Sequence, residues 1–233
     1  MSPLLIGLSV LAVFGAVLLV RPRRFYFVRH GETVLNERHI RQGEDGGLSG
    51  NGKYQAEIVG EYLKRFSIDR IISSTYPRAK ETSEIVNKHL GVQIIYSALL
   101  AERRNPKEII GKSTRDADVI KVVAQMDLSY HDDDYRFSDE ENFTDLKKRA
   151  RKCLSILALQ GTNDTVVITH HVFLKMLVAY MLYRENLHAA DFTKLTFFNA
   201  SDNAGITVCE FHPLRFLSPT MGWEVVSYNE QPE

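Results

Sequence analysis

The sequence has no excess of charge of either sign and very little cysteine. Its 233 residues carry 29 basic and 29 acidic side chains, which gives no electrostatic reason to expect nucleic acid as a partner. The two cysteines, Cys153 and Cys209, are far apart in apolar surroundings. This spacing excludes a cysteine metal motif and favours buried thiols in a reducing compartment. Internal repeats and low-complexity segments are also absent from the sequence, and its length suits one domain with a substantial core.

One long apolar run is present, Leu4–Val20, and the basic cluster Arg21–Arg24 follows it directly. A helix of this length spans roughly 25 Å, near the lower limit for crossing a bilayer. Basic residues after the run predict a single-pass membrane anchor with the main domain in the cytoplasm. A cleaved secretory signal, with basic residues before its apolar run, is the competing interpretation, and a buried core helix is another. We divide the chain into an anchor with its basic flank (1–24), a folded domain (25–229) and a tail (230–233).

Three predicted strands end at side chains that can carry chemistry. The strands are Phe25–Val28, Ile68–Ser74 and Thr165–Thr169, and the side chains that follow them are Arg29 with His30, Arg78 and His170 with His171. Ligands of α/β folds bind beyond the carboxyl ends of the strands. Arg78 also lies in the first turn of a predicted helix, where free N–H groups and the helix dipole favour an anion. The pattern predicts an anion site, although a solvated arginine and a histidine metal site are alternatives. Adjacent histidines rarely bind one metal together, and the HxxxH spacing is absent.

The rest of the chain predicts an alternation of helices and strands. Ser49 can cap a helix with apolar positions up to Phe66, Pro77 can start a helix that runs to Leu90, and Val92–Tyr96 reads as a strand. Residues 31–52 and 105–141 are expected to be largely irregular. Near the C-terminus, residues 197–201 and 205–211 are expected to form a closing hairpin.

The order and spacing of several motifs resemble the histidine phosphatase superfamily, the phosphoglycerate-mutase-like clan. The matching segments are Arg29-His30-Gly31-Glu32-Thr33 with Asn36, Gln42-Gly43, Leu48-Ser49 with Gly52, Ser73-Ser74 with Arg78-Ala79, and Glu141-Asn142-Phe143. The resemblance extends over most of the chain after the apolar run. It implies a three-layer α/β sandwich with a mostly parallel central sheet between helices. It also implies that residues 105–141 form the lid that selects the substrate.

The resemblance assigns roles residue by residue. It makes His30 the nucleophile that takes up the phosphoryl group, and it makes Arg29, Arg78 and His170 the groups that hold the phosphate. Glu102 would donate the proton, with Asp69, Glu108 and Asp116 as weaker candidates. Thr33, Asn36, Gln42, Gly43 and His171 are the candidate substrate-binding residues. His171 departs from the family pattern, which has glycine after the second histidine.

The resemblance implies an enzyme that uses no metal and no cofactor. The family's mutases carry a Tyr-Gly-x-Leu-x-Gly segment after the catalytic glutamate, and the stretch from Arg103 to Ser113 lacks it. This favours a phosphatase over a mutase, and a phosphotransferase that acts on the histidine of another protein is a further possibility. A catalytically silent, membrane-tethered binding module is the alternative from a different class. Small phosphoesters and phosphorylated proteins both remain possible substrates, and the oligomeric state is open.

Overall fold

A computed structural model describes residues 21–128, 132–160, 164–198, 201–215 and 218–232 of the chain. Six strands form one sheet in the order β3-β2-β4-β1-β5-β6. Their bounds are β1 Arg23–Arg29, β2 Ile68–Ser74, β3 Gln93–Ser97, β4 Asp164–Thr169, β5 Ile206–Phe211 and β6 Trp223–Glu230. Strands β3, β2, β4 and β1 pair in parallel, whereas β5 is antiparallel to both of its neighbours. The expected mostly parallel sheet is confirmed.

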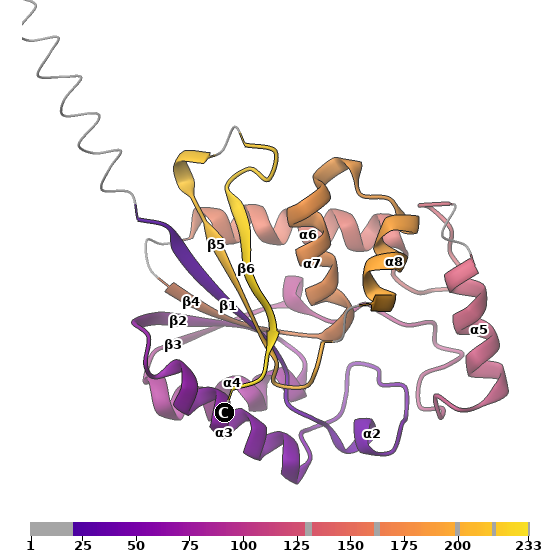
Figure 1. Cartoon of the computed structure of the whole chain (residues 1–233). Helices are drawn as coiled ribbons and strands as arrows, with labels where there is room; N and C mark the ends of the chain where they lie inside the picture. Colours follow the sequence, from indigo (N-terminus) through magenta and orange to yellow (C-terminus); the bar gives the residue numbers. More distant parts are fainter. Residues whose placement is uncertain (1–20, 129–131, 161–163, 199–200, 216–217, 233) are drawn as a thin grey trace, which may run out of the picture.

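Helices cover both faces of the sheet, so the domain has three layers (Figure 1). Their bounds are α2 Val34–Glu37, α3 Gly50–Leu63, α4 Pro77–Leu90, α5 Ala117–Leu128, α6 Phe143–Leu159, α7 His171–Tyr183 and α8 Ala189–Phe198. Two apolar clusters form the core. One packs α6 and α7 against one face of the sheet, and the other packs α3 and α4 against the opposite face. Because both faces are covered, the central strands β1 and β4 are almost entirely buried.

Several local predictions are confirmed in detail. The Ser49 side chain caps α3 by accepting a hydrogen bond from the backbone N–H of Gly52. Pro77 is the first residue of α4, and Gly91 ends that helix in the left-handed conformation. Cys153 and Cys209 are buried free thiols, and burial raises the pKa of Cys153 to about 12. These features depend on local chemistry, which the sequence displays directly.

Other predictions need correction. Residues 31–52 and 105–141 are largely irregular, as predicted, but the first contains the short helix α2, which a capping box between Thr33 and Asn36 stabilises. The second contains α5, whose Val119 is buried. The helix that Ser49 caps is shorter than predicted, because Phe66 lies beyond the end of α3.

The predicted hairpin of residues 197–201 and 205–211 is also wrong. Residues 189–198 form α8, and β5 instead pairs with β6. Asn199 and Ala200 lie outside the described residues.

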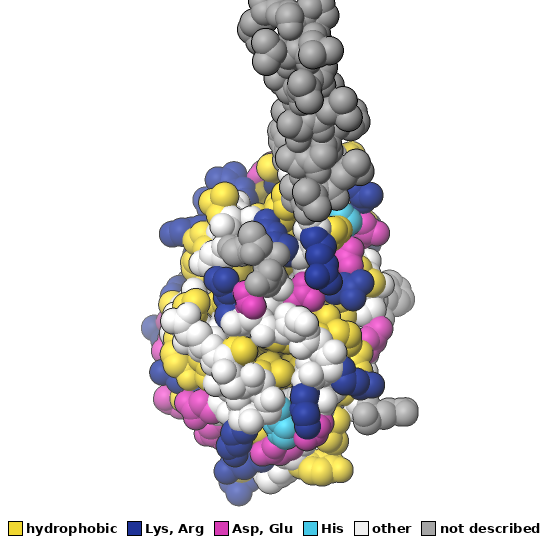
Figure 2. Space-filling view, turned by 90° about the vertical axis from the view of Figure 1, so that its left-hand side faces the viewer, with side chains coloured by type: hydrophobic (Ala, Val, Ile, Leu, Met, Phe, Trp, Pro, Cys, Tyr) yellow, Lys and Arg dark blue, Asp and Glu magenta, His cyan; other side chains and the backbone are white. Residues whose placement is uncertain are grey.

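The surface carries charges of both signs in an interspersed pattern on the face in Figure 2, in line with the equal numbers of basic and acidic residues. The apolar run Leu4–Val20 falls in the part of the chain that is not described, so the predicted anchor stays a prediction. Within the described ranges, none of the helices has the length and apolar character needed to span a bilayer.

Candidate active site

The parallel register of the sheet brings three strand ends together. Strand β4 lies between β1 and β2 and is parallel to both, so the carboxyl ends of all three meet at one edge. Arg29 is the last residue of β1 and pairs with Thr169 at the end of β4. The backbone N–H of His30 donates to the carbonyl of Thr169 over 3.0 Å. Backbone pairing therefore places the β1 and β4 termini side by side before any side chain contributes.

The two predicted catalytic histidines face one another in the interior. His30 is 3% exposed and His170 is fully buried, and their ring centroids are 5.0 Å apart. His30 Nδ1 lies 2.7 Å from the carbonyl oxygen of Gly31. Because a carbonyl can only accept, Nδ1 carries the proton and Nε2 keeps its lone pair. Burial, together with Arg78 and Arg29, holds the pKa of His30 well below its ordinary value, so the imidazole is neutral at pH 7.

A relay of hydrogen bonds orients His170. Its Nε2 lies 2.8 Å from the hydroxyl oxygen of Ser74, and that oxygen accepts from the backbone N–H of Tyr76. The Ser74 hydroxyl can donate its hydrogen to Nε2, and in that tautomer the proton of the neutral ring is on Nδ1. Burial is the main cause that keeps the pKa of His170 well below its ordinary value, and His30 adds to it. Nδ1 is buried and has no hydrogen-bond partner among the described residues, so it can donate to a bound anion.

Each of the two arginine side chains donates to a backbone carbonyl through one nitrogen and has another N–H group that can donate to a ligand. Arg29 donates through Nη1 to the carbonyl of Ser201. Arg78 is 2% exposed and donates through Nη1 to the carbonyl of Gly43 over 3.1 Å. The buried Nε atom of each guanidinium has no hydrogen-bond partner in the described part of the chain. Burial lowers the pKa of both arginines, and an anion between them would offset this cost.

Glu102 lies close by, but its carboxylate is engaged with backbone. Oε1 accepts from the N–H groups of Arg103 (2.8 Å) and Phe173 (3.0 Å), and Oε2 accepts from the N–H of Val172 over 3.1 Å. Val172 and Phe173 belong to the first turn of α7, so Glu102 serves as a side-chain cap for the helix that His170 precedes. This contact joins the candidate proton donor to the second histidine.

The alternative proton donors lie elsewhere. Asp69 is at the amino end of β2, away from the strand termini that carry the histidines. Glu108 accepts a hydrogen bond from the Ser138 hydroxyl over 2.7 Å, and Asp116 is exposed before α5. Glu102 is therefore the carboxylate among these four that the geometry favours.

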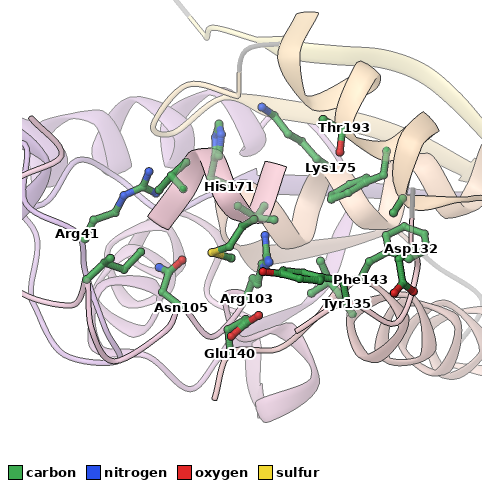
Figure 3. A pocket seen from close by; sticks show the side chains of 17 residues that line it. Arg41, Arg103, Asn105, Asp132, Tyr135, Glu140, Phe143, His171, Lys175 and Thr193 are labelled. Atoms are coloured by element: carbon green, nitrogen blue, oxygen red, sulfur yellow. The ribbon is translucent and has the colours of Figure 1, made fainter. Parts of the chain in front are cut away.

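The candidate substrate-binding residues divide into two groups. Thr33 and Asn36 bond to each other in the α2 capping box, which engages the Thr33 hydroxyl and the Asn36 Oδ1 atom. Gln42 and Gly43 line a hollow of about 110 Å³ together with Glu102 and Tyr76. His171 lines a larger hollow of about 260 Å³ between α5, α6, α7 and α8, which we call the flanking pocket (Figure 3).

Neither hollow is lined by Arg29, His30, Arg78 or His170. These four residues lie together in the interior, and we call them the catalytic floor. The two hollows lie beside it.

Sequence reasoning did not identify several residues that shape the site. Ser74 and Tyr76 orient His170, as described above. Arg149 forms an ion pair with Glu141 at 2.6 Å and donates to the carbonyl of Ala101 over 2.7 Å, which fixes the loop that carries Glu102. The Glu141-Asn142-Phe143 motif was visible in the sequence, but its partner Arg149 was not. Across the described ranges, we find no cluster of three or more His, Cys, Asp or Glu side chains placed to hold a metal ion.

The fold is an α/β fold of the phosphoglycerate-mutase type, and its strand ends bring two histidines and two arginines together. Residues 25–224 match the family model of the histidine phosphatase superfamily (branch 1). The chain belongs to this superfamily. It is 32% identical over 160 residues to a probable phosphoglycerate mutase, GpmB, of Salmonella arizonae, covering 67% of this chain and 74% of that protein. It is also 46% identical over 69 residues to an uncharacterized phosphatase, PhoE, of Bacillus subtilis, covering 29% of this chain and 36% of that one.

Solved structures agree on the fold. A mycobacterial glucosyl-3-phosphoglycerate phosphatase superposes with a TM-score of 0.74 at 22% identity, covering 89% of this chain and 99% of that chain. YhfR of Bacillus stearothermophilus superposes with a TM-score of 0.72 at 24% identity, covering 89% and 97%. The relatives that these comparisons name are phosphatases and probable mutases, so the expected membership of a phosphatase and mutase superfamily is confirmed.

Proposed function

We propose that the protein is a phosphomonoester hydrolase that works through a phosphohistidine on His30. One observation carries this proposal: a buried, neutral His30 with its Nδ1 proton directed to Gly31 lies beside His170 and close to the guanidinium groups of Arg29 and Arg78. Nε2 is then the nucleophile, and the cationic groups compensate the charge on the phosphoryl oxygens.

The reaction would take two displacements. In the first, Nε2 of His30 bonds to phosphorus, the bond from phosphorus to the ester oxygen breaks, and Glu102 in its acid form protonates the leaving alkoxide. In the second, Glu102 as carboxylate takes a proton from water, the water oxygen bonds to phosphorus, and the bond from phosphorus to Nε2 of His30 breaks, which releases inorganic phosphate and restores neutral His30. Arg29, Arg78 and His170 would stabilise the transferring group in both steps.

The role of Glu102 competes with its role as a helix cap. The three backbone N–H groups around its carboxylate are partners that suit the ionised form. Oε2 has the single bond to Val172, so we propose that this oxygen exchanges the proton. Glu102→Gln keeps an oxygen for the backbone and removes the acid. If Glu102→Gln lowers turnover but leaves thermal stability unchanged, the result supports a catalytic role. If the variant loses thermal stability and turnover together, the result supports a role in capping alone.

The decisive experiment compares the full-length protein with His30→Ala. We expect hydrolysis of p-nitrophenyl phosphate and an acid-labile phosphoenzyme in the wild type, and a loss of roughly 10⁴- to 10⁶-fold in kcat for the variant, as for other covalent nucleophiles. His188→Gln changes an exposed histidine and is the control. Turnover no greater than that of His30→Ala would support the catalytically silent binding module instead.

A mutase is the second candidate, because the GpmB relative is named a probable phosphoglycerate mutase. The missing Tyr-Gly-x-Leu-x-Gly segment favours a phosphatase. Incubation with 3-phosphoglycerate separates the two, since a phosphatase releases inorganic phosphate and a mutase releases the 2-phospho isomer. An isomer that forms faster than free phosphate would contradict the hydrolase.

We also propose that Leu4–Val20 is a single-pass membrane anchor that holds the catalytic domain in the cytoplasm. The uncharged run and the basic flank support this orientation. The protein should stay with membranes after alkaline carbonate extraction, and protease should digest the domain only in opened cells. Release by carbonate would contradict the anchor.

A further inference from the structure

Exposed apolar side chains gather at one end of the domain, the end opposite the catalytic floor. The side chains have exposed fractions between 43% and 85%, and they are Leu159 at the end of α6, Leu182 and Tyr183 at the end of α7, and Leu214 and Met221 between β5 and β6. We call these five side chains the apolar rim. Single exposed apolar residues are normal on a protein surface, whereas several at one end indicate a contact surface.

Contacts between the elements place the apolar rim around the start of β1. Strand β5 runs antiparallel to β1, and Arg23 pairs with Phe211 at the end of β5. Arg23 also donates through Nη2 to the carbonyl of Ala158 over 2.7 Å, so the last turn of α6 lies against the same strand end. The guanidinium of Arg184, which directly follows α7, contacts the sulfur of Met221. The start of β1 and the ends of β5 and α7 lie along the upper side of the domain in Figure 1.

The proposed anchor leaves little chain between the bilayer and this end of the domain. The apolar run ends at Val20, and β1 begins at Arg23. Three residue steps span at most about 11 Å when fully extended, and the headgroup layer on each side of the hydrocarbon is about 5–8 Å thick. The start of β1 therefore lies in or just above the headgroups when the run crosses the bilayer. The side chains that surround this strand end are then held against the lipid surface.

The charged side chains at this end are compatible with a lipid surface. Arg21, Arg24 and Arg215 are exposed there. Two carboxylates nearby form ion pairs with them, Glu210 with Arg24 at 2.8 Å and Glu224 with Arg215 at 3.3 Å. Apolar and aromatic side chains with arginines beside them are typical of surfaces that lie at a membrane interface. Because the ion pairs reduce the net charge, the apolar rim supplies most of the expected attachment.

We propose that the apolar rim rests in the interfacial layer of the bilayer that holds the anchor, so that the domain docks on the membrane by the amino ends of its parallel strands. This inference rests on the proposed anchor and is independent of the proposed hydrolysis. Strand β1 has seven residues, which span about 20 Å, and His30 follows its far end. The catalytic floor therefore faces away from the lipid, and its substrates arrive from the aqueous phase.

The test places a fluorescent label on the apolar rim of the full-length protein in vesicles of phosphatidylcholine and phosphatidylglycerol. Leu214→Cys carries a nitrobenzoxadiazole label, and the control is Tyr54→Cys, at a position that is 66% exposed near the start of α3. Cys153 and Cys209 are 3% and 0% exposed, so they stay unlabelled. We expect the emission of the label at position 214 to shift to the blue and to be quenched by lipids that carry a nitroxide on the acyl chain. The label at position 54 should keep the emission that it has in water.

A second variant separates docking by the apolar rim from attachment by the anchor. Leu182→Glu places a charge at a position that is 51% exposed, and it should lower the quenching at position 214. Ile120→Glu, at a position on α5 that is 54% exposed, is the matched control and should leave the quenching unchanged.

Flotation of the same samples with the vesicles distinguishes the possible failures. If the protein floats but the label at position 214 keeps the emission that it has in water, the docking is wrong and the anchor stands. If the protein does not float, both proposals are wrong. A blue-shifted label that lipids do not quench, and whose shift depends on protein concentration, would show that a second copy of the chain covers the rim, which also overturns the docking.

Discussion

The strand-end site and the flanking pocket are adjacent, yet they are built in different ways. The strand-end site consists of residues at the termini of β1 and β4 and in the first turn of α4, and backbone bonds such as His30 to Thr169 set its geometry. The flanking pocket consists of long side chains that reach inward from a loop and from α5, α6, α7 and α8. The first is held by the sheet, and the second depends on how separate elements pack.

This difference has a functional consequence. A site at the ends of paired strands is pre-organised, which suits the electrostatic demands of phosphoryl transfer. A pocket formed by side chains on separate helices can change by single substitutions without moving the strands. Within this superfamily member, the chemistry and the choice of substrate would therefore be encoded by different parts of the fold. The predictions below test that division.

The largest effect is expected at the catalytic floor, from Arg78→Lys. Lysine keeps the charge but loses the planar fork that reaches both Gly43 and a bound anion. We expect kcat for p-nitrophenyl phosphate to fall by about 10²- to 10³-fold, and product inhibition by phosphate to weaken. Arg151→Lys, an exposed arginine on α6, is the matched control. If kcat falls by less than about 5-fold, Arg78 does not contact the transferring phosphoryl group, because loss of such a contact costs about 10²-fold or more.

A smaller effect concerns the backbone that supports the strand-end site. A Cβ atom on Gly52 would overlap the backbone carbonyl of Glu32, whereas one on Gly50 would meet nothing within 4 Å. Gly52→Ala should therefore lower the free energy of unfolding by about 1–3 kcal/mol, the usual cost of overpacking, and Gly50→Ala should not lower it. Chemical denaturation measures both. If Gly52→Ala leaves the free energy of unfolding unchanged, the backbone around Glu32 and Gly52 can shift to make room for the methyl group.

A more modest loss is expected from Ser74→Ala. A Ser74 hydroxyl that donates to Nε2 holds the His170 proton on Nδ1, and without the hydroxyl the other tautomer competes. We expect kcat to fall about 10-fold with little change in stability, as when one hydrogen bond is lost. Ser74→Thr keeps the hydroxyl and should recover part of the activity. An equal loss in both variants would point to packing rather than to the tautomer.

The last prediction concerns only the pH dependence of stability and tests His171, which lines the larger hollow. Its folded pKa of about 4 is below the usual value of 6.5, so the unfolded chain binds more protons between these values and stability falls as the pH is lowered through that window. Each such histidine contributes about 1.4 kcal/mol per pH unit. His171→Gln should make the loss between pH 6.5 and 4.5 smaller by about 1–3 kcal/mol, which denaturation at several pH values measures. An unchanged slope would mean that His171 is hydrated like a surface residue.

The sequence anticipated the strand-end site because its signals are local. A β-branched and aromatic strand that ends at Arg29 and His30 is visible without any knowledge of partners, and so is a proline that places Arg78 in the first turn of a helix. The parallel arrangement of such strands then requires their ends to meet. The family membership expected from these motifs is confirmed. The individual catalytic roles remain proposals.

The sequence did not anticipate features that depend on distant packing. The segment 189–198 is a helix rather than half of a hairpin. Strand β5 pairs with β6 and not with the residues that precede β5 in the chain. The sequence gives no sign that Lys175, a polar residue on an apolar helix, is buried. Its burial results from the other helices that pack around it. The same is true of Arg149, whose contacts with Glu141 and Ala101 span up to 48 positions.

By itself, the sequence determined which side chains stand at the ends of the buried strands, since alternation, turn residues and helix caps are properties of neighbours in the chain. The tertiary structure decided the protonation and surroundings of those side chains. Burial and the approach of two guanidinium groups make His30 neutral, and the packing of four helices creates the flanking pocket. Desolvation and through-space charge act between residues that are remote in sequence, and only the folded chain brings them together.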